Sequence, residues 1–191
     1  MEKLRIGLAF TGSYCTYDKA LAAAERLCGK YDVTAIMSEN AASTDSRFGC
    51  SGEFLERLEA MTGKRVLKTI VDVEPVGPQR MFDVLVIAPC TGNTAAKLAA
   101  GITDTAVTMA AKSHLRNGRP LLLAIGTNDG LSGSAKNIGE LLNRKNVYFV
   151  PFYQDDPAGK PRSLASDYDA LERSILSAVN GEQAQPILAG R

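Results

Sequence analysis

Residues 90–94 read Cys-Thr-Gly-Asn-Thr and directly follow an apolar, mostly β-branched run at residues 84–88. Such a run is typical of a parallel strand buried on both faces, and Pro89 is expected to end it. A helix is predicted to begin near Asn93 or Thr94, so its first free N–H groups would point into the loop and attract an anion. These residues predict a ligand site at the carboxyl end of a strand, although an ordinary capped turn uses the same residue types.

Three other loops of small polar residues follow apolar runs that are predicted to be strands. The runs are residues 5–10, 33–37 and 121–125, and the loops after them contribute Gly12 and Ser13, then Ser38, then Gly126 and Thr127. Because the carboxyl ends of parallel strands meet at one edge of a sheet, we expect these loops to share one site.

The first two of these loops differ from the common nucleotide-binding motifs. The loop at Gly12 lacks the three spaced glycines of the dinucleotide fingerprint, and it is not a Walker loop. Ser38 supplies a neutral hydroxyl where a dinucleotide fold carries an acidic residue that binds the ribose. A mononucleotide phosphate therefore fits these residues better than a pyrophosphate.

The cysteine and histidine content argues against metal or thiol chemistry. The four cysteines are scattered without a Cys-x-x-Cys pair, and His114 is the only histidine, so we predict reduced thiols and no metal site. Cys15 and Cys90 have no base near them in the sequence, and we expect neither to be a nucleophile. His114 lies near the end of a helix predicted at residues 105–114, where a cation suits the helix dipole, so a surface or capping role is expected.

Length and composition are those of one globular domain. The chain has 191 residues, 45% of them hydrophobic, which is enough for a sizeable core. We assign residues 1–180 to a single domain and expect residues 181–191 to be a frayed C-terminal tail. The net charge of +1 gives no reason to expect nucleic acid or an anionic membrane as a partner. Lys3 and Arg5 lead directly into a strand and no apolar run could span a bilayer, so a cytoplasmic protein is expected.

Strands and helices alternate along the chain. Further strands are predicted at residues 66–70 and 147–151, and further helices at residues 17–27, 53–61, 135–142 and 167–179. Residues 71–78 contain two prolines and are predicted to be a loop, and residues 153–163 an irregular polar segment. The predicted fold is flavodoxin-like or Rossmann-like, with a parallel sheet in a three-layer α/β/α sandwich.

Three separate strand ends resemble the flavoprotein family that includes phosphopantothenoylcysteine decarboxylase, the lantibiotic cysteine decarboxylases and the flavin prenyltransferases. The similarity rests on Thr11-Gly12-Ser13, on Ser38, and on Ala88-Pro89-Cys90-Thr91-Gly92-Asn93-Thr94 with Lys97, Gly101-Ile102 and Asp104 downstream. By this resemblance the chain binds FMN and forms homo-oligomers, either trimers or multiples of trimers. The implied FMN-binding residues are Gly12, Ser13, Ser38, Thr91, Gly92, Asn93, Thr94, Gly126 and Thr127.

This chain is similar to one branch of this family at residues 151–157, at Lys160-Pro161 and at Ser163-Leu164. That resemblance implies an oxidoreductase subunit in the mother cell of a sporulating bacterium, active only with a dinucleotide-binding partner, the A subunit, which holds NAD(P). The implied reaction oxidises a dihydrodipicolinate-type precursor to dipicolinic acid, and the hydride passes to the flavin or is relayed to the nicotinamide of the partner. Lys97 and Arg162 are candidates to bind the carboxylates of the substrate, although a solvated surface charge is the favoured alternative for each, and no catalytic residue is assigned.

Two alternative functions belong to different classes. A flavin-dependent decarboxylase of the parent family would carry a histidine just before the central strand, where residues 73–76 read Val-Glu-Pro-Val. It would also carry a Pro-x-Met-Asn-x-x-Met clamp where residues 124–130 read Ala-Ile-Gly-Thr-Asn-Asp-Gly. A non-catalytic scaffold would keep the fold and leave all the chemistry to the partner, and flavin bound to the purified protein would argue against that alternative.

Overall fold

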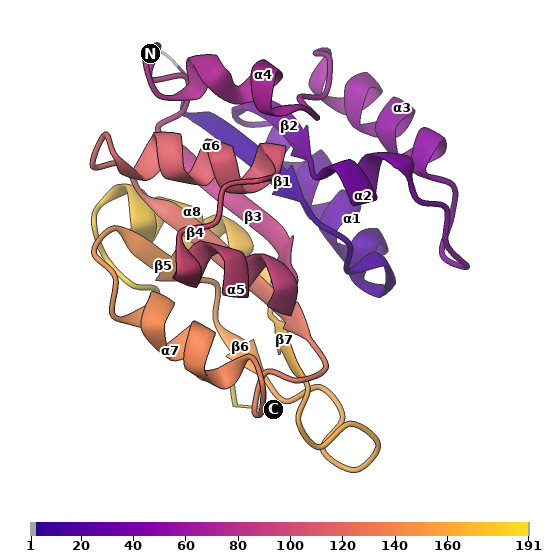
Figure 1. The fold of residues 1–191 in the computed structure, drawn as a ribbon, viewed down its shortest axis with the longest axis vertical. Coiled ribbons are helices and arrows are strands. Elements are labelled where there is room, and N and C mark those ends of the chain that lie inside the picture. Colours follow the sequence, from indigo (N-terminus) through magenta and orange to yellow (C-terminus); the bar gives the residue numbers. More distant parts are fainter. Residues whose placement is uncertain (1–2, 191) are drawn as a thin grey trace.

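Five parallel strands form the central sheet, in the order β2-β1-β3-β4-β5 (Figure 1). In this computed structural model, which describes residues 3–190, they are β1 (Arg5–Phe10), β2 (Asp32–Met37), β3 (Val84–Cys90), β4 (Leu121–Thr127) and β5 (Val147–Phe149). Most of their residues are buried, because the sheet is covered on both faces. The strand order is flavodoxin-like and reverses direction between β1 and β3.

Two layers of helices cover the sheet, and each encloses its own apolar core. One layer comprises α1 (Tyr17–Cys28), α3 (Ser51–Thr62) and α8 (Leu171–Val179). The other comprises α4 (Ile70–Val73), α5 (Gly92–Ala100), α6 (Ala106–Leu115) and α7 (Ala135–Leu142). The predicted three-layer α/β/α fold is confirmed, and the helix predicted at residues 135–142 has the bounds of α7.

The end of β3 differs from the prediction. The strand continues through Pro89 to Cys90, so the expectation that Pro89 ends it is wrong. The pairing of β3 with β4 shifts register between Ile87 and Cys90, which accommodates a residue that has no N–H to donate. Only Thr91 separates the strand from α5, and the helix begins at Gly92 rather than at Asn93 or Thr94.

Residues 66–78 hold more helix and less strand than predicted. The strand predicted at residues 66–70 is reduced to one parallel bridge between Ile36 and Leu67. The Thr69 hydroxyl accepts the N–H of Asp72 while the Asp72 carboxylate accepts the N–H of Thr69, and this capping box starts α4. Pro75 lies in the first turn of η2 (Glu74–Val76), where a helix tolerates a residue without an N–H, so the loop predicted at residues 71–78 is wrong.

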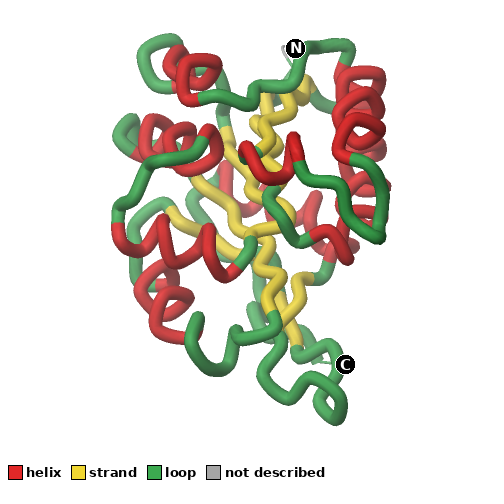
Figure 2. The backbone as a smooth tube through the Cα atoms, turned by 45° about the vertical axis from the view of Figure 1, so that its right-hand side comes forward, coloured by secondary structure: helices red, strands yellow, loops and turns green. Residues whose placement is uncertain are grey.

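A short antiparallel hairpin extends the sheet beyond β4. It consists of β6 (Phe152–Tyr153) and β7 (Leu164–Ser166), and β7 pairs with the end of β4 through Gly126 and Thr127. The segment predicted to be irregular is therefore a loop held between two paired strands. Figure 2 shows this loop projecting at one end of the molecule.

The segment after α8 packs against the sheet. The Gln183 side chain accepts the Phe149 N–H and donates to the Phe149 carbonyl, so it satisfies the outer edge of β5. Leu188 forms a parallel bridge with Phe152 of β6. The expectation of a frayed tail is therefore wrong for residues 182–190, because the edge strands offer it hydrogen-bond partners.

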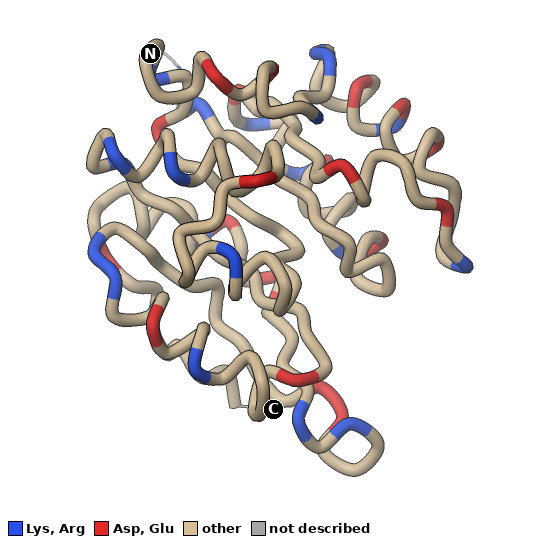
Figure 3. Tube along the Cα trace, viewed as in Figure 1, with Lys and Arg blue, Asp and Glu red and all other residues tan. Residues whose placement is uncertain are grey.

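Lys and Arg residues are interspersed with Asp and Glu residues along the chain (Figure 3), in keeping with the net charge of +1. Within residues 3–190, no helix combines the length and the apolar character needed to cross a membrane.

Candidate functional site

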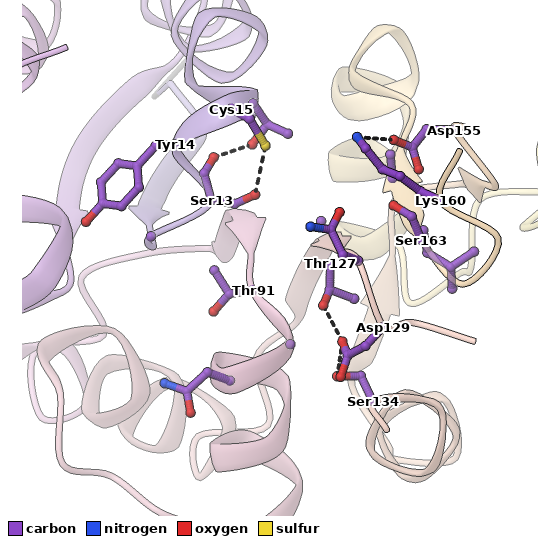
Figure 4. Close-up of a pocket in the computed structure, with 18 of the residues that line it drawn as sticks. Ser13, Tyr14, Cys15, Thr91, Thr127, Asp129, Ser134, Asp155, Lys160 and Ser163 are labelled. Atoms are coloured by element: carbon purple, nitrogen blue, oxygen red, sulfur yellow. Dashed lines mark hydrogen bonds and ion pairs between the residues drawn. The ribbon is translucent and has the colours of Figure 1, made fainter. Parts of the chain in front are cut away.

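A pocket of about 580 Å³, called the large pocket because it is the larger of two adjoining pockets at this edge of the sheet, lies at the carboxyl ends of β1, β3 and β4 (Figure 4). Seven of the nine predicted ligand residues line it, namely Gly12, Ser13, Thr91, Gly92, Asn93, Gly126 and Thr127. The pocket lies where the strand order reverses, which is the place where open α/β sheets bind their ligands. The β6–β7 loop forms its far wall.

The other two predicted residues line an adjacent pocket of about 410 Å³ and have local structural partners. The Ser38 hydroxyl accepts the N–H of Ala41 at 3.3 Å and so caps α2 (Glu39–Ser43). The Thr94 side chain is 7% exposed, and its hydroxyl lies 2.9 Å from that of Thr91. Asn93 lines both pockets, which makes them neighbouring compartments of one site.

Thr11 joins the first and central loops. Its hydroxyl donates to the Pro89 carbonyl at 2.8 Å and accepts the Thr91 N–H at 3.1 Å. The Tyr17 hydroxyl in turn donates to the Thr11 carbonyl at 3.1 Å. These buried hydrogen bonds hold the ends of β1 and β3 together and set the position of the pocket between them. The sequence placed Thr11 beside the site, but nothing in it indicated this bridging role.

The start of α5 presents unpartnered backbone donors to the pocket. The Thr91 hydroxyl accepts the N–H of Thr94 at 3.1 Å, which satisfies one of the free groups at the helix start. The N–H groups of Gly92 and Asn93 have no hydrogen-bond partner elsewhere in residues 3–190. Both residues line the pocket, so their N–H groups and the positive end of the helix dipole are available to an anionic or carbonyl-bearing ligand.

A carboxylate supports this helix start from the β4 side. Asp129 accepts hydrogen bonds from the hydroxyls of Thr127 at 2.5 Å and Ser134 at 2.8 Å, and these bonds hold the pKa of Asp129 below its usual range. Gly92 packs directly on this cluster: a Cβ atom there would lie 2.6 Å from both the Thr127 and the Ser134 hydroxyl oxygens. A side chain at position 92 would therefore displace either the helix start or the cluster.

The two cations predicted to bind substrate carboxylates lie outside the large pocket. Lys97 lines the adjacent pocket, where its Nζ is 2.9 Å from both carboxylate oxygens of Asp104 and holds the pKa of Asp104 below its usual range. The Arg162 side chain is exposed and lines neither pocket. The structure instead brings Arg47 and Lys160 to the wall of the large pocket. Lys160 belongs to the segment that carried the branch similarity, whereas no sequence pattern marked Arg47.

Aromatic side chains add apolar surface to the same pocket. Tyr14 and Phe48 line it, and the Tyr14 hydroxyl donates to the Asn40 carbonyl at 3.0 Å. Phe48 remains 44% exposed, with the Arg47 guanidinium 4.8 Å from its ring centre. Both residues lie on the α1–α3 side of the pocket, so a flat ring system would meet apolar surface there.

His114 and Cys90 are buried structural residues. The expected surface or capping role of His114 is wrong: its side chain is 1% exposed and its Nε2 donates to the Pro120 carbonyl at 3.0 Å. Burial lowers the pKa of His114 to about 4, so the imidazole is neutral at physiological pH. Burial raises the pKa of the Cys90 thiol to about 12, which keeps it protonated and supports the prediction that it is not a nucleophile.

Cys15 differs from Cys90 because it is exposed and lines the large pocket. Its sulfur lies 4.0 Å from the Ser13 hydroxyl. Over the described part of the chain, no three His, Cys, Asp or Glu side chains gather closely enough to hold a metal ion.

Comparison with known proteins identifies the family to which this chain belongs. A family model described as flavoprotein matches residues 1–163. The chain belongs to the flavoprotein family. It is 43% identical over 185 residues to the dipicolinate synthase B subunit of Bacillus subtilis (strain 168), and the match covers 96% of this chain and 92% of that protein. This similarity confirms the branch of the flavoprotein family that residues 151–164 indicated.

Two solved structures of other proteins have a similar architecture. The crystal structure of the dipicolinate synthase B subunit from Bacillus halodurans is 40% identical, with a TM-score of 0.90 over 100% of both chains. Burkholderia xenovorans DmrB in complex with FMN is 21% identical and has a TM-score of 0.70 over 93% of this chain and 96% of that chain. The latter similarity concerns the fold alone.

The residues present in the large pocket fit a flavin mononucleotide. Its volume of about 580 Å³ falls in the usual range for small-molecule sites. The free N–H groups of Gly92 and Asn93 and the hydroxyls of Ser13 and Thr91 supply donors, and Tyr14 supplies an aromatic surface. The absence of three spaced glycines after β1 is compatible with one phosphate rather than a pyrophosphate.

Proposed function

We propose that this chain acts as the B subunit of a dipicolinate synthase and that it binds FMN in the large pocket. The observation that carries the proposal is the convergence of the β1, β3 and β4 loops on one pocket that holds seven of the residues predicted to bind FMN. The similarity to the B subunits of two dipicolinate synthases, which extends over nearly the whole chain, supports the assignment of the reaction.

When bound, FMN supplies a two-electron acceptor for a hydride from a dihydropyridine-type ring. The chain itself holds and orients the cofactor: the N–H groups of Gly92 and Asn93 and the Thr91 hydroxyl are the donors proposed to face it. The substrate ring must lie against the cofactor, and the part of the pocket lined by Asp155, Lys160 and Ser163 of the β6–β7 loop is the place proposed for it.

The site lacks groups that a self-sufficient dehydrogenase would need. The loop after β1 has no dinucleotide fingerprint, and the sole histidine is buried against Pro120 away from the pocket lining. These features support a partner, the A subunit of dipicolinate synthase, that contributes NAD(P). They also disfavour the decarboxylase alternative, since that reaction would use a histidine in the site.

Cofactor binding is tested by titrating the apoprotein with FMN, FAD and NAD in parallel while following flavin fluorescence or protein quenching. We expect saturable binding of FMN with a dissociation constant no higher than tens of micromolar, and weaker binding of FAD and NAD. No saturation with FMN, or a preference for FAD, would contradict the cofactor assignment.

The reaction is tested by measuring dipicolinate formation from freshly generated precursor with each subunit separately and with the two mixed. We expect product only from the mixture that contains FMN and NAD(P). Full activity of the isolated A subunit would favour the scaffold alternative, and full activity of this chain alone would contradict the requirement for a partner.

A further inference from the structure

The wall formed by the β6–β7 loop carries polar groups that the fold itself does not use. The Ser163 side chain is 3% exposed and lines the large pocket, and its hydroxyl forms no hydrogen bond with any of residues 3–190. Because this hydroxyl lines the pocket, its donor is available to a ligand that binds there. Figure 4 shows Ser163 beside Lys160 on the side of the pocket opposite Ser13 and Cys15.

Lys160 is less strongly paired than the other lysine near the site. Its Nζ lies 3.6 Å from Asp155 Oδ2, and the Lys160 side chain is 51% exposed. Lys97 by contrast has both Asp104 oxygens at 2.9 Å. A charge-assisted N–H···O bond is normally about 2.7–2.9 Å long, so Lys160 retains more capacity for a second anion than Lys97 does.

The loop holds Lys160 and Ser163 in a fixed relation. The Lys160 N–H donates to the Asp156 carbonyl at 2.7 Å, and the Ser163 N–H donates to the Lys160 carbonyl at 3.0 Å. The Gln154 amide donates to the Pro161 carbonyl at 2.7 Å and closes the base of the loop. These bonds fix the backbone that carries Lys160 and Ser163, and both residues line one wall of the pocket. An ammonium group and a hydroxyl can both donate hydrogen bonds to a carboxylate.

We propose that Lys160 and Ser163 form a carboxylate subsite that binds one carboxylate of a small aromatic or dihydroaromatic dicarboxylate. This inference rests on the proposed function and adds the residues that recognise its substrate. The subsite lies across the pocket from the β1 loop, so a substrate held there occupies the space between the loop wall and the residues assigned to the cofactor. It replaces Lys97 and Arg162 as the site of substrate recognition.

The direct test is equilibrium titration of the FMN-loaded chain with dipicolinate. We expect Lys160→Ala to weaken dipicolinate binding about 10- to 100-fold and Ser163→Ala about 3- to 10-fold, the usual range for charged and neutral hydrogen bonds. Lys160→Arg should recover most of the loss. Arg162→Ala is the matched control, because it removes a cation two residues away that lines neither pocket, and its affinity should equal that of the wild type.

Three outcomes would overturn the subsite. They are failure of the wild type to bind dipicolinate, equal losses in Lys160→Ala and Arg162→Ala, and a loss of FMN affinity in Lys160→Ala that matches the loss for dipicolinate. The last result would assign Lys160 to the cofactor phosphate. Steady-state kinetics of the mixed subunits give a second readout, in which Lys160→Ala should raise KM and change kcat little.

The two proposals can fail separately. If the mixed subunits form no dipicolinate but the chain binds dipicolinate through Lys160, the proposed reaction is wrong and the subsite stands. If the mixture is active and Lys160→Ala changes neither dipicolinate affinity nor KM, the reaction stands and the subsite is wrong.

Discussion

Asn93 and Thr94 are neighbours in the first turn of α5 but have different surroundings. Asn93 is exposed and lines both pockets, and it contributes a free N–H and an amide side chain. Thr94 is buried, and its hydroxyl pairs with that of Thr91, which is the cap of the helix. The same predicted motif therefore contains one residue that is free to contact a ligand and one that stabilises the helix start.

Substitution at these two positions should separate the two roles. We expect Asn93→Ala to weaken FMN binding by about 1–3 kcal/mol and to leave the stability of the apoprotein nearly unchanged, because only the ligand loses a partner. Thr94→Val should destabilise the apoprotein by about 1 kcal/mol. FMN titration and thermal unfolding of both apoproteins measure this, and equal loss of stability in the two variants would show that Asn93 also acts only structurally.

His114 is a neutral imidazole buried near the end of α6. Its folded pKa of about 4 lies below the ordinary histidine pKa of about 6.5, which applies to the unfolded chain. Below pH 6.5 the unfolded state therefore binds a proton that the folded state does not bind. The free energy of unfolding is nearly constant above that pH and decreases as the pH falls toward 4.

Chemical unfolding at pH 7 and pH 5 tests this consequence. We expect the wild type to lose about 2 kcal/mol of unfolding free energy between these values. His114→Gln should lose much less over the same interval, because glutamine does not titrate, although it should be less stable at pH 7. Carboxylates with lowered pKa, such as Asp129, act mainly below this range. An equal loss in both proteins would contradict the assignment to His114.

Among the secondary-structure elements, α5 depends most closely on its neighbours. Its first residue, Gly92, contacts the hydroxyls of Thr127 and Ser134, which are themselves held by Asp129. Gly92 therefore lies where three segments pack together: the start of α5, the end of β4 and the residues before α7.

Gly92→Ala should disturb this packing. A Cβ atom 2.6 Å from two oxygens forces either the helix start or the hydroxyl cluster to move, so we expect a loss of about 1–3 kcal/mol in stability together with weaker FMN binding. The matched control is Gly139→Ala in α7, where a Cβ meets nothing within 4 Å and alanine should stabilise the helix by about 0.5–1 kcal/mol. Thermal unfolding and FMN titration of both variants provide the comparison, and equal behaviour would refute the packing argument.

The β6–β7 loop takes no part in the strand pairing around it, because β6 pairs with β7 and β7 pairs with β4 through residues outside the loop. Replacing residues 155–161 with two glycines should leave FMN binding close to that of the wild type. Dipicolinate formation by the mixed subunits should fall at least about tenfold, since the substrate loses its positioning wall or the A subunit loses a contact surface. Full activity of the shortened protein in the mixture would show that the loop has neither role.

Across the molecule, the pocket joins loops from both halves of the sheet and from the added hairpin. A ligand that binds there stabilises only the folded chain. FMN at about 100 times its dissociation constant should therefore add about 2.7 kcal/mol, which corresponds to roughly 5–11 °C in Tm. NAD at the same concentration should produce no shift, and a thermal scan in which FMN and NAD behave alike would contradict selective binding.

The parallel sheet, most of the helices and the edge that carries the site could be predicted from the sequence alone. The runs that became β1 and β3 are largely apolar because both faces of the sheet are covered, and this local pattern depends little on partners. Gly12, Thr91 and Gly126 follow such runs, so their convergence follows from parallel strand geometry.

The sequence did not specify the partners or positions of several other residues at or near the pocket. Ser38 became the cap of α2, Lys97 was neutralised by Asp104, and Lys160 and Arg47 reached the pocket wall from loops distant in the sequence. The β6–β7 hairpin and the Gln183 contact with β5 likewise depend on pairing between remote segments. The physical reason is that a hydrogen-bonding group, on a side chain or on the backbone, pairs with whichever partner the folded chain brings within about 3 Å, and sequence spacing does not specify that partner.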